Sequence, residues 1–364
     1  MLISDLDTPS LVIDLDVMER NLRNAAVYAR QKNLRLRPHT KTHKIPELGR
    51  MQLHLGAAGL TVAKVSEAEV MMEADPPELL IAYPVVSTQK ASRLAGIAQQ
   101  VAVTVSLDSI EAAKQVSVAA KTAGVEIGVL GEMDAGMQRV GVDPGAELSD
   151  LARNVMSLPG LRFKGIAFFA GHVHPLVDGG LAQLERLAST VRNAVQTLDR
   201  AGIPVQIVSG GSTPSLFFSH QIPYLNEVRP GTYIFNDRNT VLSGACGYEE
   251  CAATIITTVI STARHGQVII DAGSKTLSSD PPAVPDFVGF GHVVDMPEAV
   301  IRALNEEHGY VDVHKVGRRL AVGERLQVVP NHICVAVNLQ NEVYGVRNGV
   351  VEQIWNVKAR GKLH

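Results

Sequence analysis

The chain has 364 residues, 46% of them apolar, with 34 Lys and Arg against 37 Asp and Glu and a net charge of −3. This length suits two domains, or one barrel with an appended domain. Neither sign of charge gathers into a long run, so the sequence carries no electrostatic footprint for nucleic acid or an anionic membrane, and a small-molecule ligand fits better.

The amino terminus and the cysteines indicate the cellular compartment. Residues 1–16, MLISDLDTPSLVIDLD, are acidic where a signal peptide is basic. No uncharged apolar run reaches the roughly 18 residues of a membrane span. The three cysteines are too few for a disulfide framework. We therefore expect a soluble protein of the cytoplasm that does not bind a membrane.

The first strand-like segment, PSLVIDLD, precedes the main repeats of the chain. We assign residues 1–18 to an N-terminal strand that joins the C-terminal domain. The segment VMERNLRNAAVYARQKN then predicts a helix leading into the repeats.

Eight short apolar runs alternate with amphipathic stretches between residue 34 and about residue 235. The runs are NLRLRP, AAGLTVA, ELLIAYP, QVAVTVSL, VEIGVLGEMD, FKGIAFFAG, PVQIVSGG and LNEVRPG. Between most of them lie helix-like segments bounded by Gly or Pro. Eight strand–helix repeats over about 200 residues predict a (β/α)8 TIM-like barrel, which we place at residues 19–244.

The sequence changes in character beyond about residue 245. β-branched runs such as CAATIITTVISTA are separated by turn residues, with one helix-like patch near Glu298 to Glu307. These features predict a second, mainly β domain at residues 245–364.

The stretch RPHTKTHK follows the first apolar run of the barrel and contains two lysines. In a strand, Arg37, His39 and Lys41 would share one polar face and Lys41 would be the last residue on it. Barrel enzymes hold their active sites at the C-terminal ends of the strands, whereas Lys44 suits the start of a helix. Lys41 is therefore the candidate nucleophile for a carbonyl compound, and a solvated loop lysine is the alternative.

The stretch VSGGSTPS follows the seventh run. Gly210 and Gly211 allow close backbone approach, and the Ser212 and Thr213 hydroxyls with nearby amides can hold a phosphate group. A tight turn without a ligand is the alternative. A lysine after the first strand and a phosphate loop after the seventh together predict pyridoxal 5'-phosphate, whose aldehyde and phosphate need these two anchors.

Several blocks resemble one enzyme family in kind and order: DTPSLVIDLDVMERNLR, RPHTKTHK, EMDAGMQRVGV, SGGSTPS, VRPGTYIFND and PNHIC. The chain resembles the D-serine dehydratase and D-threonine aldolase family over nearly its whole length. The resemblance implies the alanine-racemase-like fold of type III pyridoxal-phosphate enzymes, and a homodimer. It also implies the residues that bind the cofactor, namely Lys41, His39, Arg139, Gly210, Gly211, Ser212, Thr213 and Tyr233. For Arg139 the alternative is a salt bridge, and for Tyr233 a buried tyrosine.

Two residues near the carboxyl terminus are candidate metal ligands. In VVPNHICVAVNLQ, His332 and Cys334 would fall on one face of a strand, from which both can reach one ion. Two protein ligands leave positions open for substrate, and the soft sulfur favours zinc, with another divalent ion such as Mn2+ as the alternative. A buried cysteine beside a hydrogen-bonded histidine is the alternative without a metal. In the family this position resembles the metal pair, and Cys rather than Asp resembles the dehydratase branch.

A further histidine block, FFAGHVHP, follows the sixth run. His172 resembles the histidine proposed near the substrate hydroxyl in the aldolase branch. It is therefore a candidate general base, with a loop histidine as the alternative.

These features predict a pyridoxal-phosphate- and zinc-dependent lyase for small D-3-hydroxy amino acids, with D-serine dehydration to pyruvate and ammonia as the main hypothesis. The alternative is a D-threonine aldolase or 3-hydroxy-D-aspartate aldolase, which releases glycine and an aldehyde. A racemase would need a second base on the opposite face of the cofactor. A non-catalytic pyridoxal-phosphate carrier would have no use for metal ligands, and a metal-dependent barrel hydrolase would need more ligands at the strand ends.

Overall fold

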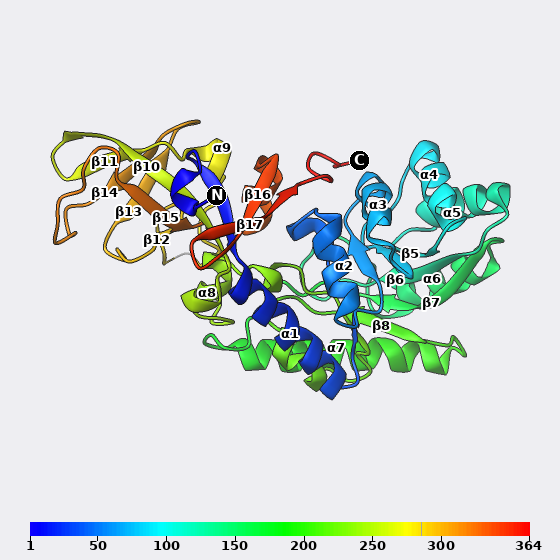
Figure 1. Ribbon diagram of the computed structural model, residues 1–364. Coiled ribbons are helices and arrows are strands. Elements are labelled where there is room, and N and C mark those ends of the chain that lie inside the picture. Colours follow the sequence, from blue (N-terminus) through cyan, green and yellow to red (C-terminus); the bar gives the residue numbers. More distant parts are fainter. Residues whose placement is uncertain (285) are drawn as a thin grey trace. The chain divides into compact units, whose positions relative to one another are not determined.

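The computed structural model describes residues 1–284 and 286–364, and these residues divide into two compact units (Figure 1). The β unit comprises Met1–Leu22, Thr42–Ile45 and Thr232–Arg360, and the barrel unit comprises Arg23–Lys41, Pro46–Gly231 and Gly361–His364. The β unit thus resumes at Thr232, earlier than the expected residue 245. The predicted fold class, a (β/α)8 barrel with a mainly β C-terminal domain, is confirmed.

A parallel sheet of eight strands forms the barrel unit, within the described part of the chain. The strands are β2 (Arg35–Leu36), β3 (Leu60–Val62), β4 (Glu78–Ile81), β5 (Ala102–Leu107), β6 (Ile127–Glu132), β7 (Leu161–Ala167), β8 (Ile207–Gly210) and β9 (Glu227–Val228). Each corresponds to one predicted apolar run, and their order in the sheet is β2-β9-β8-β7-β6-β5-β4-β3. Every residue of β6 is buried, as expected of a parallel strand covered on both faces.

Backbone contacts between the β2 and β3 segments close this sheet into a barrel. His39 bridges Thr61 in parallel register. The amide of Thr61 donates to the carbonyl of Pro38, and that of Ala58 to the carbonyl of Leu36, both at 2.8 Å. A closed barrel has no edge strands, and the C-terminal ends of all its strands lie at one mouth.

Helices connect the strands and flank them in Figure 1. Those of the barrel unit are α2 (Pro46–His54), α3 (Val65–Met71), α4 (Thr88–Ala98), α5 (Ile110–Ala123), α6 (Ala146–Ser157) and α7 (Gly180–Arg200), and α1 (Leu15–Gln31) connects the two units along the chain. Local signals fix their ends: at α5, Ser109 Oγ accepts the amide of Ala112, and Gly124 ends the helix at φ 68°. No helix among the described residues is long and apolar enough to cross a lipid bilayer.

A sheet of nine strands forms the β unit among the described residues. The strands are β1 (Ser10–Asp14), β10 (Ala253–Arg264), β11 (Gln267–Ile270), β12 (His292–Val293), β13 (Val300–Leu304), β14 (Gly309–Asp312), β15 (Arg325–Val329), β16 (Glu342–Arg347) and β17 (Val350–Asn356), and the helices are α8 (Arg238–Leu242), α9 (Ser274–Leu277) and α10 (Ile333–Leu339). β1 pairs antiparallel with β10 and parallel with β16, so the N-terminal strand lies inside this sheet.

Two secondary-structure predictions in the β unit are wrong. The helix-like patch near Glu298 to Glu307 is strand β13, because pairing with β14 outweighs its local helix propensity. The expected strand through His332 and Cys334 is instead helix α10. Its buried residues Ile333, Ala336 and Val337 are spaced as on one face of a helix. The strand prediction had instead assumed that alternate residues of this run face the same side.

An ion pair is buried inside the barrel unit where β2 meets β9. Nε of Arg37 donates to Glu227 at 2.9 Å, and the two side chains are 2% and 1% exposed. Burial would lower the pKa of Arg37, but Glu227 and Glu78 raise it, so the guanidinium stays charged. Ser209 Oγ donates to Glu227 at 2.7 Å and accepts from Arg229 at 2.6 Å. The charges of neighbouring strands are thus joined by one hydrogen-bond network.

Replacing Arg37 with methionine should leave Glu227 buried without its partner. We expect the free energy of unfolding, measured by urea titration, to fall by about 3–5 kcal/mol. The control is Arg162→Met, which breaks the exposed Arg162–Glu126 pair at 3.8 Å and should change the free energy of unfolding by less than about 1 kcal/mol. Equal, small losses in both variants would contradict the role given to the buried pair.

Candidate active site

Lys41 lies just after the C-terminal end of β2, in a 3-10 turn over Thr40–Thr42. The expected polar strand face ending at Lys41 is wrong, because β2 is short and Arg37 is buried. The Lys41 side chain is exposed, and its backbone amide donates to Nδ1 of His39 at 3.4 Å. Lys44 is buried and precedes α2. Of the two lysines, only Lys41 is exposed at the mouth.

Phe169 brings Lys41 and Arg139 together. Nζ of Lys41 lies 5.8 Å from the centre of the Phe169 ring, and Cζ of Arg139 lies 5.2 Å from it. Both distances are within the range of cation–π attraction. Phe169 was not among the predicted site residues, although it is the second residue of the quoted FFAGHVHP block. A pair of aromatic residues just after a barrel strand is the signal that could have identified it.

The loop that carries Arg139 is shaped by Asp134. Its Oδ1 accepts the amides of Gly136 and Gln138 at 2.9 and 3.1 Å, and Gly136 adopts φ 106°. A Cβ atom at Gly136 would lie 3.1 Å from Nε2 of His172, so the imidazole packs against this loop. The exposed His172 therefore lies beside the loop of Arg139.

The glycine-rich stretch after β8 forms a tight loop. Gly211 adopts φ 85°, and Ser212 is buried with its hydroxyl 3.1 Å from that of Ser215. Within the described residues, the amides of Gly211 and Ser212 have no hydrogen-bond acceptor. Thr213 follows, half-buried. Amides without a partner beside hydroxyl groups are the chemistry expected of a phosphate site.

His332 and Cys334 come together at the start of α10. His332 is the residue before the helix, and Cys334 lies in its first turn, so the two side chains start two positions apart in the chain. The His332 side chain is 37% exposed, so an ion can reach it. Burial would lower the pKa of His332, but Cys334 and Asp237 raise it to about 9. An arriving metal ion would therefore displace a proton.

Two threonine hydroxyls surround the thiol of Cys334. Thr42 Oγ1 lies 3.2 Å from its sulfur, and Thr232 Oγ1 lies 3.9 Å from it. Thr42 directly follows Lys41 in the chain, and Thr232 directly precedes Tyr233. Tyr233 is buried within a 3-10 turn of the β unit. The sequence neighbours of two predicted cofactor residues thus contact the predicted metal ligand.

Asp237 is a neighbour of this pair that sequence reasoning missed. It is 1% exposed, and its Oδ2 lies 3.7 Å from Nδ1 of His332. Its Oδ1 accepts the amide and hydroxyl of Thr240 at the start of α8, and its Oδ2 accepts the amide of Ile333. Burial raises the pKa of Asp237, and His332 and these donors offset that only in part. The pattern FNDRNT, with Asp as a helix-capping residue, is the signal that could have identified it.

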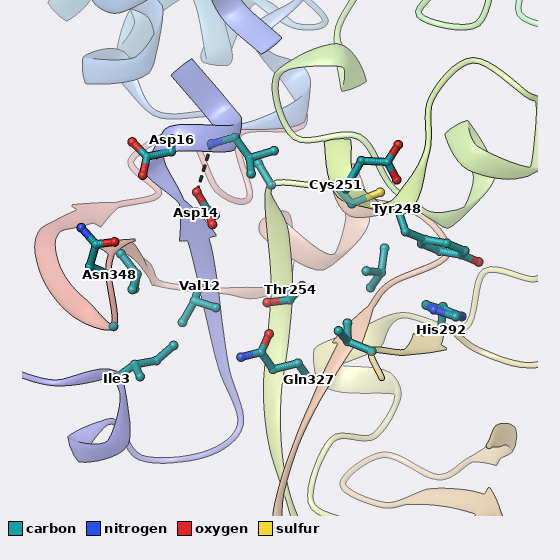
Figure 2. A pocket seen from close by; sticks show the side chains of 17 residues that line it. Ile3, Val12, Asp14, Asp16, Tyr248, Cys251, Thr254, His292, Gln327 and Asn348 are labelled. Carbon is teal, nitrogen blue, oxygen red and sulfur yellow. Dashed lines mark hydrogen bonds between the residues drawn. The ribbon is translucent and has the colours of Figure 1, made fainter. Parts of the chain in front are cut away.

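A cavity of about 660 Å³ lies elsewhere in the β unit (Figure 2). Its wall includes Tyr248, whose ring stacks on His292 at 3.8 Å. Asp14 on this wall accepts the amide of Val17, and Asp16 pairs with Arg347. None of the predicted site residues lines this cavity, among the residues that the structure describes. Asp14 and Asp16 on its wall are thus already engaged by other groups of the β unit.

Comparison with known proteins assigns both units to a class of fold. Residues 13–239 match the family model of the alanine racemase N-terminal domain, and residues 252–346 match that of a putative serine dehydratase domain. The chain is therefore an alanine-racemase-like barrel joined to a serine-dehydratase-type domain. It belongs to the family of D-threonine aldolases and D-serine dehydratases, and it is a pyridoxal-phosphate-dependent lyase.

Individual relatives span almost the full length of the chain. A D-threonine aldolase of Arthrobacter sp. is 35% identical over 98% of this chain and 93% of its own. The crystal structure of D-threonine aldolase from Filomicrobium marinum matches with a TM-score of 0.92, at 34% identity, over 99% of this chain and 98% of its own. D-threo-3-hydroxyaspartate dehydratase of Delftia sp. is 32% identical over 90% of this chain and 91% of its own. One solved structure of a D-threo-3-hydroxyaspartate dehydratase, with a TM-score of 0.87, 29% identity and 98% coverage of both chains, is a cysteine-to-alanine variant in the metal-free form.

Replacing Gly210 with alanine should disturb the loop after β8. The new Cβ would overlap the ring of Phe168, which is fully buried and directly precedes Phe169. We expect the free energy of unfolding to fall by about 1–3 kcal/mol in a urea titration. The matched control is Gly96→Ala in α4, where no atom lies within 4 Å of the new Cβ and stability should rise by about 0.5–1 kcal/mol. An unchanged free energy of unfolding in Gly210→Ala would show that the Phe168 ring can move to make room for the new Cβ.

Proposed function

We propose that this lyase dehydrates D-3-hydroxy amino acids, with D-serine or a close 3-hydroxy-D-amino acid as the substrate. The observation that carries the proposal is the placement of His332 and Cys334 together at the start of α10, with the Cys334 sulfur beside the hydroxyls of Thr42 and Thr232. A thiolate with an imidazole favours zinc over harder ions, and zinc can activate a hydroxyl leaving group. The metal-free cysteine-to-alanine variant of a related dehydratase supports a metal role for a cysteine.

The loop after β8 fits the phosphate of pyridoxal phosphate. The amides of Gly211 and Ser212 would bind its oxygens together with the hydroxyl of Thr213, and Gly210 would allow close approach. Lys41 would anchor the aldehyde, and Arg139, beside the same aromatic ring as Lys41, would bind the cofactor ring. His39 and Tyr233 would complete the contacts. When bound, the cofactor supplies an electron sink for the charge that develops at Cα of the substrate.

Lys41 would also move the first proton. Its side chain is exposed, and its Nζ lies 5.8 Å from the centre of the Phe169 ring. Once released from the cofactor aldehyde, this amine would accept the proton from Cα. Arg139, on the same ring, has hydrogen-bond donors but no acceptor atom, so it would not compete for that proton.

His332 and Cys334 would hold the metal ion. No group of three or more His, Cys, Asp and Glu side chains could hold an ion within the part of the chain that the structure describes, so this pair would act with substrate or water in the open positions. Zinc would polarise the β-hydroxyl of the substrate as a Lewis acid, and Mn2+ is the alternative ion. The thiol of Cys334, two residues after His332, is the donor that a soft metal selects.

Retro-aldol cleavage to glycine and an aldehyde is the second candidate. The aldolase relatives favour it, and so does the position of His172 against the loop of Arg139. An exposed imidazole there could take the proton from the β-hydroxyl, which breaks the bond between Cα and Cβ. We place this function second because the thiol ligand fits the activation of a leaving hydroxyl better.

The proposal includes the setting of the enzyme. We propose that residues 19–244 bind the cofactor, that residues 245–364 hold the metal, and that the active form is a homodimer of the cytoplasm. No disulfide joins the cysteines within the described residues, in keeping with a reducing compartment. Light scattering during gel filtration measures the oligomeric state, and a monomeric mass would overturn the dimer.

Product analysis tests the reaction type. Purified protein loaded with pyridoxal phosphate and zinc is incubated with D-serine, D-threonine and 3-hydroxy-D-aspartate, and keto acid, ammonia, glycine and aldehyde are measured. We expect keto acid and ammonia in equal amounts, lost after chelation and restored by zinc, because the metal activates the leaving group. Glycine with an aldehyde would move the enzyme to the aldolase reaction, and no product from any substrate would favour a carrier.

Replacing Lys41 with alanine should remove both the covalent anchor and the base. We expect turnover to fall by about three orders of magnitude or more, and the visible absorption of the covalently bound cofactor to disappear. The control is Lys121→Ala, which changes an exposed lysine in the last turn of α5 and should leave both unchanged. A Lys41→Ala variant that keeps the absorption band would assign the anchor to another lysine.

A further inference from the structure

We propose that Asp237 positions the histidine ligand of the metal site, so that Nε2 of His332, and not Nδ1, binds the ion. This inference rests on the His332 and Cys334 pair of the proposed function. Asp237 would not touch substrate, cofactor or metal. It would act only through the imidazole, as a carboxylate behind a metal-bound histidine commonly does.

The carboxylate of Asp237 is held from two directions. Oδ1 accepts the amide and the hydroxyl of Thr240 at 2.8 and 2.7 Å, and Oδ2 accepts the amide of Ile333 at 3.0 Å. The backbone adds to this frame, because the amides of Arg238 and Asn239 donate to the carbonyls of Pro330 and Asn331. The start of α8 and the start of α10 are therefore fixed against each other at this carboxylate.

The imidazole of His332 presents Nδ1 to this fixed group. Nδ1 lies 3.7 Å from Oδ2 of Asp237, and the carboxylate is 1% exposed, so solvent does not compete for the contact. Nδ1 and Nε2 lie on opposite sides of the ring. A proton on Nδ1 facing the carboxylate leaves the lone pair of Nε2 for a metal ion.

A role of Asp237 in stability alone can be distinguished from a role in positioning His332 by a control variant. The β unit contains a carboxylate with similar hydrogen bonds, Asp271, that serves as this control. Asp271 also accepts three hydrogen bonds, from Thr257 and Thr258 at Oδ1 and from Thr8 at Oδ2, at 2.6–2.9 Å. Among the described residues, its hydrogen-bond donors are these three threonines and not His332. Asp271→Asn therefore removes a similarly bonded charge from the same unit without touching the metal pair.

The first test measures zinc affinity. The full-length chain, Asp237→Asn, Asp271→Asn and Cys334→Ala are freed of metal and titrated with zinc against a chromophoric chelator, and thermal unfolding of each metal-free protein is recorded beside it. We expect Asp237→Asn to bind zinc about 10- to 100-fold more weakly than the unchanged chain. Asp271→Asn should bind zinc within about twofold of it, and Cys334→Ala should lose the site.

The second test needs no variant at position 237, so it stands even if Asp237→Asn fails to fold. Nitrogen-15 NMR of histidine-labelled protein, with the His332 signals assigned by His332→Gln, should show zinc on Nε2 and a proton on Nδ1. Zinc on Nδ1, unchanged zinc affinity in Asp237→Asn, or equal loss in both Asp→Asn variants would overturn the role of Asp237. Absence of zinc binding by the unchanged chain would instead refute the metal pair of the proposed function, and with it this inference.

Discussion

The ion pair between Arg37 and Glu227 is the constraint on which the packing of β2 against β9 inside the barrel depends. Two charges that are almost fully buried are stable only together, so β2 and β9 must meet in the register that joins them. Arg229 and Ser209 extend the network to β8, which ends in the glycine-rich loop. One set of charges thus fixes both the strand that leads to Lys41 and the strand that leads to the proposed phosphate site.

Covalent connection ties the chemistry of the lysine to that of the thiol. Lys41 ends one segment of the barrel unit, and the next four residues belong to the β unit. Thr42, the first of them, contacts the sulfur of Cys334, and Thr232, where the chain returns to the β unit, lies on the same sulfur. The lysine is therefore one peptide bond from a residue that touches the proposed metal ligand.

The sequence was sufficient for the barrel, because each of its eight parallel strands corresponds to an apolar run in the sequence. It also located Lys41 just after the first of these strands, although not on a strand face. It failed where the signal depended on partners distant in sequence. The local sequence of residues 298–307 favours a helix, and only the pairing with β14 makes it a strand. The apolar run after His332 is so short that its spacing fits the period of a strand as well as that of a helix. Phe169 and Asp237 were not predicted as site residues. Their importance comes from contacts with Lys41 and His332, and a local sequence pattern does not reveal contacts between distant residues.

When a metal ion has two protein ligands, the orientation of each ligand depends strongly on the residues that surround it. Each ligand must be aimed without the help that a third or fourth would give, and an imidazole that rotates would lose the ion. Here both ligands have such neighbours: Asp237 faces His332, and two threonine hydroxyls surround the sulfur of Cys334. In the proposed site, the positions left open on the metal would be those for the substrate hydroxyl, and a small ligand set with well-held neighbours would suit a catalytic rather than a structural ion.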